Sequence, residues 1–428
     1  MPRVPVRQGL PRPRDALTAC LRARRMQTVV IEKPYEFVPP VYSKAWQAVM
    51  RHYIPRWIRK TYGVHSIETR NAERVRQSLD AGNAVLLAPN HSRLSDPLTF
   101  ADLSRIAKCD LHTMASWHLF MQSKLERFML RRVGAFSVYR EGVDRQSINT
   151  AVDILVDGAR PLVIFGEGAI SRHNDELMPM MDGLAFIART AAKRREKIPG
   201  AGGVVIHPVA IRYFFRGDLE AAVTPVLEEI ESHFSWHPQQ DKSLIQRLRQ
   251  IGQALLSLKE IEYFGWARTG DFYERVDNLI EDVLTKLESR WNIREPAEGV
   301  VARVKNLRSA IVPQLLAEDT SPEDRHLFRR QLAACYYVQQ MSHYPRNYVR
   351  MSEKNIPEHI LETVERFEED FTDRVRVHGP LHAVVQIGEA IPVEGRRERG
   401  GGCDPLMEQI RTQITDMLKA LASESPRI

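Results

Sequence analysis

The sequence lacks the features that mark several classes of protein. Its four cysteines are far apart and form no CxxC pair; they are Cys20, Cys109, Cys335 and Cys403. This spacing argues against a disulfide framework and a thiolate zinc site, and it is typical of a reducing cytoplasm. No apolar run approaches the roughly 18 residues that a spanning helix needs, and the amino terminus has no secretory signal. We therefore expect a cytoplasmic protein that does not cross a membrane.

Glycine and proline, at 23 and 25 of the 428 residues, are too scarce for a fibrous or low-complexity chain. The length instead predicts two or three globular domains. Charge is uneven, because residues 1–60 hold 13 Lys and Arg against three acidic residues; this segment carries +10 and the rest of the chain −3. A basic end on an acidic body suggests an anionic partner, either phospholipid headgroups or nucleic acid. No nucleic-acid-binding module is recognisable, which argues against the second.

Residues 41–62 repeat apolar and aromatic side chains at helical spacing, namely Tyr42, Trp46, Val49, Met50, Tyr53, Trp57 and Ile58. Basic side chains lie off this stripe, so the pattern predicts a basic amphipathic helix with aromatic anchors. Two interpretations stay open: the helix lies on a membrane surface, or it docks on the core and leaves its basic face in solvent. Together with the proline-rich residues before it, the helix defines a predicted amino-terminal region, residues 1–62.

Between residues 63 and 220, short apolar runs such as AVLLAP and PLVIF alternate with helical patterns. This rhythm is typical of βαβ units and predicts an α/β fold with a mostly parallel sheet flanked by helices. Residues 221–376 have helical periodicity and are predicted to form a helical insertion or subdomain. Residues 377–421 return to the α/β core, with HAVVQIGEAIPV (382–393) as one more strand and a terminal helix after it.

Ligands on such sheets gather where strands end, and the first candidate site follows the first apolar run directly. In NHSRLSDP, His91 stands at a strand end and Asp96 lies five residues on, near the start of a helix. An imidazole there could remove a hydroxyl proton, and a neighbouring carboxylate could orient the imidazole and stabilise its protonated form. The same spacing also arises from a surface histidine beside a helix-capping aspartate.

Three further segments place polar residues in or after apolar runs. Arg140 follows the apolar part of GAFSVYRE, and its guanidinium could hold a phosphate through two parallel hydrogen bonds. In VIFGEGAISRHND, Gly166 and Gly168 allow close approach of a ligand. Glu167 between them could accept hydrogen bonds from a substrate hydroxyl or an arginine, or lie solvated in a tight turn. His207 in VVIHPVAIRY is interpreted as a structural histidine of a core strand.

In this order, the four segments resemble the glycerophospholipid acyltransferase superfamily, and most closely its 1-acylglycerol-3-phosphate acyltransferase group. The Asn-His-x4-Asp block of that family is matched by Asn90, His91 and Asp96. Its second block, from Gly to Arg, is matched by Gly134–Arg140, its Phe-Pro-Glu-Gly block by Phe165, Glu167 and Gly168, and its apolar fourth block by Val205–Ile211.

The resemblance implies a role for each matched residue. His91 is expected to be the general base on a glycerol hydroxyl, with Asp96 as its partner. Arg140 is expected to contact the acceptor phosphate, and Glu167 with Gly168 to form part of the acceptor pocket. Acyl-CoA or acyl carrier protein would supply the acyl group as a thioester, and no bound cofactor or metal is expected.

The third block departs from the family pattern. Gly166 replaces the usual proline, and Ala169 and Ile170 stand where Thr-Arg usually follows, so the nearest arginine is Arg172. Either Arg172 reaches the acceptor phosphate from a longer turn, or the acceptor has no phosphate there, as in a diacylglycerol. The membrane-embedded helices usual in the family have no apolar counterpart, so the helix within 41–62 would lie at the membrane surface in their place.

The prediction is therefore an acyltransferase of phospholipid biosynthesis, peripheral at an anionic membrane surface. It would move a fatty acyl group from a thioester donor to a glycerol hydroxyl of a lysophospholipid such as 1-acylglycerol-3-phosphate. Transfer would be direct, because the sequence has no Gly-x-Ser-x-Gly elbow and no cysteine at a strand end beside a histidine. The alternative, which the altered third block favours, is a catalytically silent lipid-binding protein on anionic membranes.

Overall fold

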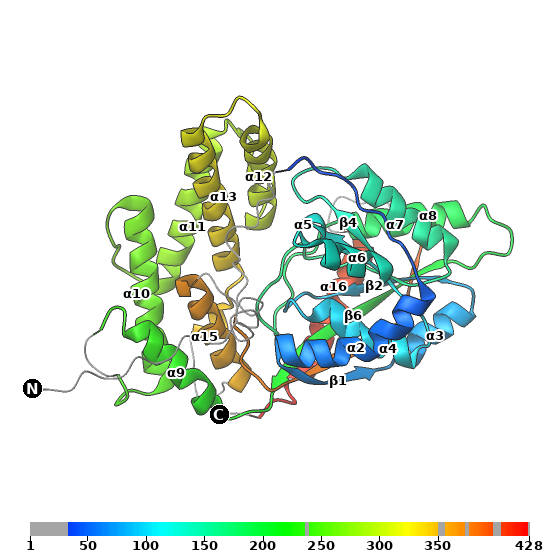
Figure 1. Cartoon of the computed structure of the whole chain (residues 1–428), viewed down its shortest axis with the longest axis horizontal. Coiled ribbons are helices and arrows are strands. Elements are labelled where there is room, and N and C mark those ends of the chain that lie inside the picture. Colours follow the sequence, from blue (N-terminus) through cyan, green and yellow to red (C-terminus); the bar gives the residue numbers. More distant parts are fainter. Residues whose placement is uncertain (1–32, 236–238, 350–355, 373–375, 397–403, 427–428) are drawn as a thin grey trace, which may run out of the picture.

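A computed structural model describes residues 33–235, 239–349, 356–372, 376–396 and 404–426 (Figure 1). Most of the predicted amino-terminal arm, residues 1–32, lies outside them. The described part is built on one eight-stranded sheet with the order β1-β7-β6-β2-β5-β3-β4, and β8 pairs with β6. Helices flank this sheet, so the predicted α/β fold with additional helices is confirmed.

The strands that carry the sequence motifs run in one direction. Strands β2 to β6 are mutually parallel, whereas β7 and β8 are antiparallel to β6, and β1 is parallel to β7. Their bounds are Val64–Arg70 (β1), Ala84–Pro89 (β2), His112–Ser116 (β3), Ala135–Val138 (β4), Leu162–Val163 (β5), Val204–Phe215 (β6), Leu381–Ile387 (β7) and Ile391–Val393 (β8). Because every residue of β2 and β6 is buried, these two strands form the centre of the sheet.

The prediction of one strand over 382–393 is wrong, because the segment forms two strands. Both β7 and β8 pair with β6, and residues 388–390 separate them. The interruption lies opposite Pro208 of β6, which has no backbone N–H to offer to a neighbouring strand. The Pro208 carbonyl instead accepts a hydrogen bond from the Gly388 amide at 2.7 Å.

Alternate residues of the strands enter two apolar layers, one on each face of the sheet. In β2, for example, Val85 and Leu87 join one layer and Leu86 the other. The first layer is covered by helices that include α2 (Lys44–Tyr62), α3 (Glu73–Asp80) and α4 (Asp96–Ile106); the second by α7 (Arg145–Asp157), α8 (Gly183–Arg195) and α16 (Pro405–Ala422). Two short helices, α5 (Trp117–Phe120) and α6 (Lys124–Arg132), lie between β3 and β4.

The helical region between β6 and β7 consists of two parts. Helices α9 (Leu219–Glu231) and α15 (Pro357–Thr372) pack into the first layer of the sheet, and the start of α10 (Leu244–Phe264) joins them. A separate apolar core is formed by α11 (Phe272–Arg290), α12 (Val300–Leu316) and α13 (Pro322–Ser342) together with the end of α10. The short α14 (Arg346–Val349) leads toward α15.

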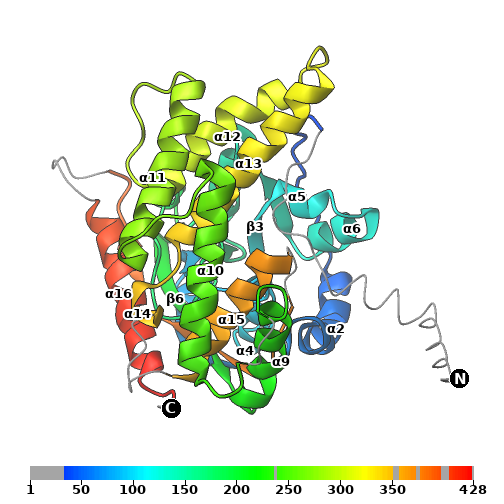
Figure 2. The same ribbon diagram turned by 90° about the vertical axis from the view of Figure 1, so that its left-hand side faces the viewer.

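Helix α15 lies between α10 and the sheet (Figure 1), and from the side α10, α13 and α15 stand in front of the strands (Figure 2). A bilayer-spanning helix needs both length and a sustained apolar character. None of the helices in the described residues combines the two.

Candidate active site

Three of the sequence motifs follow strands that end on the same side of the sheet, and among the described residues contacts join the first motif to the third but not to Arg140. His91 follows β2, Arg140 follows β4 and Glu167 follows β5 by a few residues. Because these strands are parallel and neighbours or near neighbours, their carboxyl ends lie at the same edge.

The His91 and Asp96 side chains are in direct contact. The Nδ1 atom of His91 lies 2.8 Å from Oδ2 of Asp96, which is the first residue of α4 and is fully buried. An ionised carboxylate only accepts hydrogen bonds, so Nδ1 carries the proton and Nε2 keeps a lone pair. The imidazole also lies against the Phe165 ring, with centroids 4.2 Å apart. This arrangement is suited to a general base that works through Nε2.

The orientation of the Asp96 carboxylate is fixed by two further donors. The backbone N–H of Arg93 donates to Oδ2 at 2.9 Å, and the Tyr213 hydroxyl of β6 donates to Oδ1 at 2.6 Å. Burial, followed by the nearby Asp96, raises the pKa of Tyr213 well above its usual value, so the hydroxyl stays a donor. Sequence reasoning missed Tyr213, which lies two residues beyond the matched fourth block.

Glu167 holds the backbone of the histidine loop. Its Oε1 accepts the His91 N–H at 2.5 Å and its Oε2 accepts the Met178 N–H at 3.1 Å. The side chain is buried, and this burial raises its pKa to about 8. Gly168 follows with φ +69°, and a Cβ there would come within 2.6 Å of Met181. The glycine therefore serves a tight, left-handed turn.

Two buried asparagines attach the motif loops to the side of β6. Asn90 donates to the Ile211 carbonyl at 3.0 Å and accepts from the Ile211 N–H at 2.7 Å. Asn174, after the third motif, makes the same pair of hydrogen bonds with Tyr213, both at 3.0 Å. Sequence reasoning matched Asn90 to its block without a role and missed Asn174.

Arg140 stands exposed after β4. No hydrogen bond or ion pair with any other described residue holds its guanidinium. The surrounding protein and the cation of Arg308 lower the pKa of Arg140, and Glu141 opposes this shift. Arg308 belongs to α12 and forms an ion pair with Glu141, so the separate helical core contributes a second guanidinium beside the second motif.

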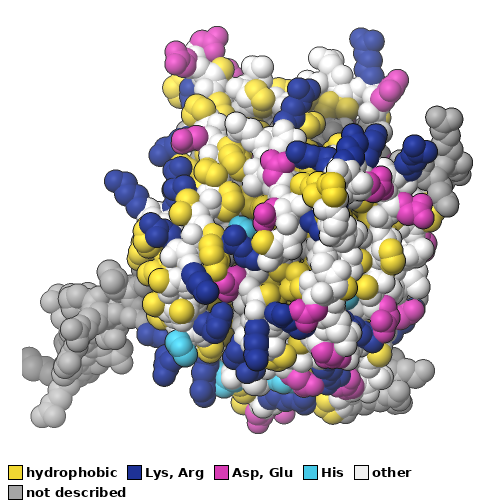
Figure 3. All heavy atoms as spheres, turned by 90° about the vertical axis from the view of Figure 1, so that its right-hand side faces the viewer, with side chains coloured by type: hydrophobic (Ala, Val, Ile, Leu, Met, Phe, Trp, Pro, Cys, Tyr) yellow, Lys and Arg dark blue, Asp and Glu magenta, His cyan; other side chains and the backbone are white. Residues whose placement is uncertain are grey.

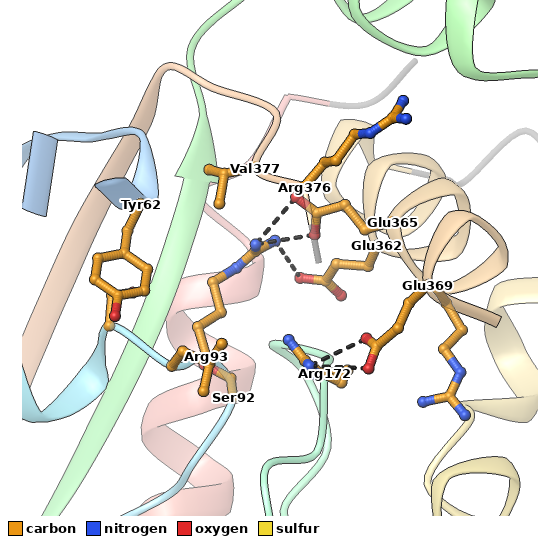
Figure 4. Close-up of a pocket in the computed structure, with 12 residues that line it drawn as sticks. Tyr62, Ser92, Arg93, Arg172, Glu362, Glu365, Glu369, Arg376 and Val377 are labelled. Atoms are coloured by element: carbon orange, nitrogen blue, oxygen red, sulfur yellow. Dashed lines mark hydrogen bonds and ion pairs between the residues drawn. The ribbon is translucent and has the colours of Figure 1, made fainter. Parts of the chain in front are cut away.

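Arg172 forms an ion pair with α15, a helix that sequence reasoning did not assign to the site. Its guanidinium pairs with Glu369 of α15 at 3.0 Å, and the backbone of Arg172 is left-handed, with φ +68°. Arg93, in the histidine loop, pairs with Glu365 of α15 at 2.9 Å. Figure 4 shows both arginines reaching across a pocket toward the carboxylates of this helix.

Four glutamates of α15 face β6 and the loops that carry the motifs, and their spacing is the signal that could have revealed them. Glu358, Glu362, Glu365 and Glu369 follow one another at intervals of four, three and four residues, which places them on one face of a helix. Glu358 accepts the Phe215 N–H at 2.7 Å, and Glu362 binds the Asn174 side chain. Burial raises the pKa of Glu362 to about 8.

His207 is a structural histidine, as predicted. Its Nε2 lies 2.9 Å from the Ser78 hydroxyl and its Nδ1 lies 2.9 Å from the Gly388 carbonyl, and the ring is buried. Among the described residues, no group of three or more His, Cys, Asp or Glu side chains is arranged to hold a metal ion.

Comparison with known proteins identifies the part of the chain that bears the motifs. Residues 66–212 match a family model described as Acyltransferase. The match begins within β1 and ends in β6, so it includes His91, Asp96, Arg140 and the third motif and leaves out α9 to α15. No curated protein matches the chain.

Proposed function

Residues 66–212 belong to the acyltransferase family, the glycerophospholipid acyltransferases, and from this premise we propose that the chain transfers a fatty acyl group from a thioester to a glycerol hydroxyl. The observation that carries the proposal is the 2.8 Å contact between His91 Nδ1 and the buried Asp96 carboxylate. This contact leaves Nε2 as a base at the edge of the sheet.

The proposed reaction is direct. His91 Nε2 removes the proton of the acceptor hydroxyl while the oxygen attacks the thioester carbonyl carbon. The new C–O ester bond forms and the C–S bond breaks, and the imidazolium returns its proton to the departing thiolate. Asp96 orients the imidazole and stabilises its positive charge during transfer. No residue becomes acylated.

Arg140 is our candidate for the phosphate of a lysophospholipid acceptor such as 1-acylglycerol-3-phosphate. Arg140 is exposed as a residue and its guanidinium has no hydrogen-bond or ion-pair partner among the described residues, so an incoming phosphate displaces no carboxylate from it. A contact of Arg172 with the acceptor phosphate remains a prediction. For this contact, the Arg172 guanidinium would have to leave the Glu369 carboxylate and bind the phosphate in its place. Glu167 and Gly168 act in this proposal by holding the loop that carries His91.

The acyl donor is acyl-CoA or an acyl carrier protein, and the acceptor is drawn from an anionic membrane on which the protein works peripherally. The absence of a candidate spanning helix in the described residues is compatible with this arrangement. The basic, amphipathic α2 supplies the contact with the anionic surface.

The test is thiol release from palmitoyl-CoA, with and without lysophosphatidic acid in mixed micelles. Wild-type protein should release thiol only with acceptor, and His91→Ala should lower the rate by about 10²–10⁴-fold while keeping the native circular dichroism spectrum. His207→Asn is not a suitable control because His207 is buried; His326→Ala, at an exposed position of α13, removes a histidine away from both the site and the helix that we propose to contact the membrane.

Each other result has a defined meaning. Acceptor-independent release would indicate a thioesterase, and undiminished transfer by a folded His91→Ala protein would refute the general base. Absence of transfer with every thioester donor and every acceptor, with or without phosphate, would favour a catalytically silent lipid-binding protein.

A further inference from the structure

Helices α2 and α6 form one continuous surface, although about 60 residues separate them in sequence. The Trp46 and Phe128 rings meet edge to face with centroids 5.4 Å apart. The chain before α2 and the end of α6 are also joined, because the Val41 N–H donates to the Arg131 carbonyl at 3.0 Å and the Gln47 amide donates to the Val133 carbonyl at 2.8 Å.

This surface exposes large apolar side chains on both helices. On α2, Val49 and Tyr53 are 56% and 51% exposed and lie one turn apart. The predicted apolar stripe of this helix is therefore only partly buried: Met50 and Ile58 pack on the protein, whereas Val49 and Tyr53 face outward. On α6, Leu125 and Phe128 are 65% and 44% exposed, and none of its nine residues is buried.

The same two helices carry an excess of positive charge. Helix α2 has five Lys and Arg and no acidic residue, and α6 has four Lys and Arg against Glu126. The basic residues are Lys44, Arg51, Arg56, Arg59, Lys60, Lys124, Arg127, Arg131 and Arg132. In Figure 3 yellow and dark blue side chains gather at the edge of the molecule beside the grey segment, with little magenta among them.

We propose that this α2–α6 surface is a membrane-docking face that inserts Val49, Tyr53, Leu125 and Phe128 among the headgroups of an anionic bilayer. Apolar side chains surrounded by Lys and Arg are the pattern of an interfacial membrane contact. Charge complementarity selects this occupant. A second copy would bring a surface of the same sign, and residues 1–32, with seven arginines against two acidic residues, would be repelled too.

The face is mechanically joined to the candidate active site. Helix α2 packs against α4, whose first residue is Asp96, and α6 packs against β4, which leads to Arg140. A bilayer on this face would therefore hold the protein in a fixed orientation relative to the residues that we propose to act on the acceptor. In this respect the inference rests on the proposed function, but membrane attachment can be measured without catalysis.

The experiment is vesicle flotation of the full chain, comparing phosphatidylcholine alone with phosphatidylcholine plus phosphatidylglycerol. Leu125→Asp should weaken attachment to the anionic vesicles by about tenfold or more, because it removes an inserted apolar group and adds a repelled charge. Trp266→Asp is the matched control, since Trp266 is 64% exposed and lies outside both helices. It should float as wild type does. Both sites are exposed, so neither substitution threatens folding.

Equal attachment of Leu125→Asp, Val49→Asp and wild type would overturn the proposal and assign attachment to other residues. Loss of attachment in Trp266→Asp would overturn it as well, as would wild-type protein that binds neither vesicle. Turnover of a short-chain, monomeric acceptor separates the two hypotheses. A Leu125→Asp protein that fails to float but keeps this turnover supports the docking face, whereas wild-type protein that floats without any turnover contradicts only the proposed function.

Discussion

Two groups of charged residues adjoin each other at the edge of the sheet, and they are assembled in different ways. His91 and Asp96 are five residues apart, and a strand end and a helix start bring them together. The ion pairs of Arg93 with Glu365 and of Arg172 with Glu369 join residues 272 and 197 positions apart. The first group is made by the matched domain alone, and the second requires α15 from outside it.

We call His91 with Asp96 the short-range group, and the residues that contact the glutamates of α15 the long-range group. In our proposal the first carries out the proton transfer, and the second holds the loops around it in place. The short-range group leaves a basic nitrogen available, whereas the long-range pairs consume charges that could otherwise bind an anion. An arginine beside the histidine that we propose as the base is thus not by itself an anion site. Of the three arginines in the first three motif segments, only Arg140 has no hydrogen-bond or ion-pair partner among the described residues.

The largest expected effect comes from the short-range group. Asp96→Asn keeps the shape of the side chain but offers an N–H where the carboxylate accepted one, so the wrong tautomer of His91 is favoured. We expect kcat for acceptor-dependent thiol release to fall by roughly 10²–10⁴-fold, with unfolding by urea as the check on folding. A folded Asp96→Asn protein with near-wild-type kcat would show that the His91–Asp96 contact is not needed for the reaction.

The pH dependence of stability tests the long-range group. Burial raises the pKa of Glu362 from 4.5 to about 8, so the folded state holds this proton more tightly than the unfolded state does. The stability that this provides is complete below about pH 4.5 and is lost as the pH rises through about 8. Glu362→Gln keeps a neutral side chain and should show a smaller fall in melting temperature between pH 5 and 8.

The control for this measurement is Glu298→Gln, at an exposed position away from α15. It should reproduce the wild-type decline, because its side chain is exposed and lies outside the buried glutamate face of α15. The pKa of Glu167 is also raised to about 8. The melting temperature of the Glu362→Gln protein should therefore still fall between pH 5 and 8, but by less than that of the wild type. An equal fall in melting temperature in Glu362→Gln and in wild type would show that Glu362 is not responsible for the loss of stability between pH 5 and 8.

The contrast between Arg140 and Arg172 gives the next effect in size. Arg140→Ala should raise KM for lysophosphatidic acid by roughly 10–100-fold, which corresponds to charge-assisted hydrogen bonds to one phosphate. Its stability should hardly change, because the guanidinium contacts no described partner. KM for an acceptor without phosphate should also stay near the wild-type value.

Arg172→Ala is the matched variant from the other group. It leaves the buried Glu369 without its cation, so it should lower the free energy of unfolding by about 3–5 kcal/mol and change KM much less than Arg140→Ala does. Equal increases in KM would show that both arginines bind the acceptor phosphate, which for Arg172 was one of the two alternatives that the altered third block left open.

The same contrast explains how far sequence reasoning reached. The alternation of apolar runs and helical patterns predicted the α/β sheet, because buried strands can be recognised in the sequence as short runs of apolar residues. The His91 and Asp96 pair was predictable since both members lie in one short segment. The two strands in place of one at 382–393 were not, because the break depends on Pro208 in a partner strand some 180 residues away.

The contacts of α15 were out of reach for a different reason. The acidic side chains of a helix usually face solvent. The sequence EHILETVERFEEDF does not indicate which residues lie opposite its glutamates. The i, i+4, i+7, i+11 spacing of its glutamates indicates one face, but only the fold shows that this face meets Arg93, Arg172 and Asn174. Tyr213 was missed likewise, because its partner is 117 positions away.

The smallest expected effect concerns this tyrosine. Tyr213 donates its single hydroxyl proton to Asp96, so the Ser95 hydroxyl, 2.8 Å from the Tyr213 oxygen, must donate in turn. Tyr213→Phe removes the hydrogen bond and keeps the ring beside Arg93; kcat should fall roughly 3–10-fold at unchanged KM, the scale of one net hydrogen bond. Tyr348→Phe is the counterpart in the long-range group, since that hydroxyl binds Glu362 at 2.8 Å. It should lower the melting temperature and leave kcat unchanged; equal losses of kcat in both variants would mean that the two groups act as a single catalytic unit.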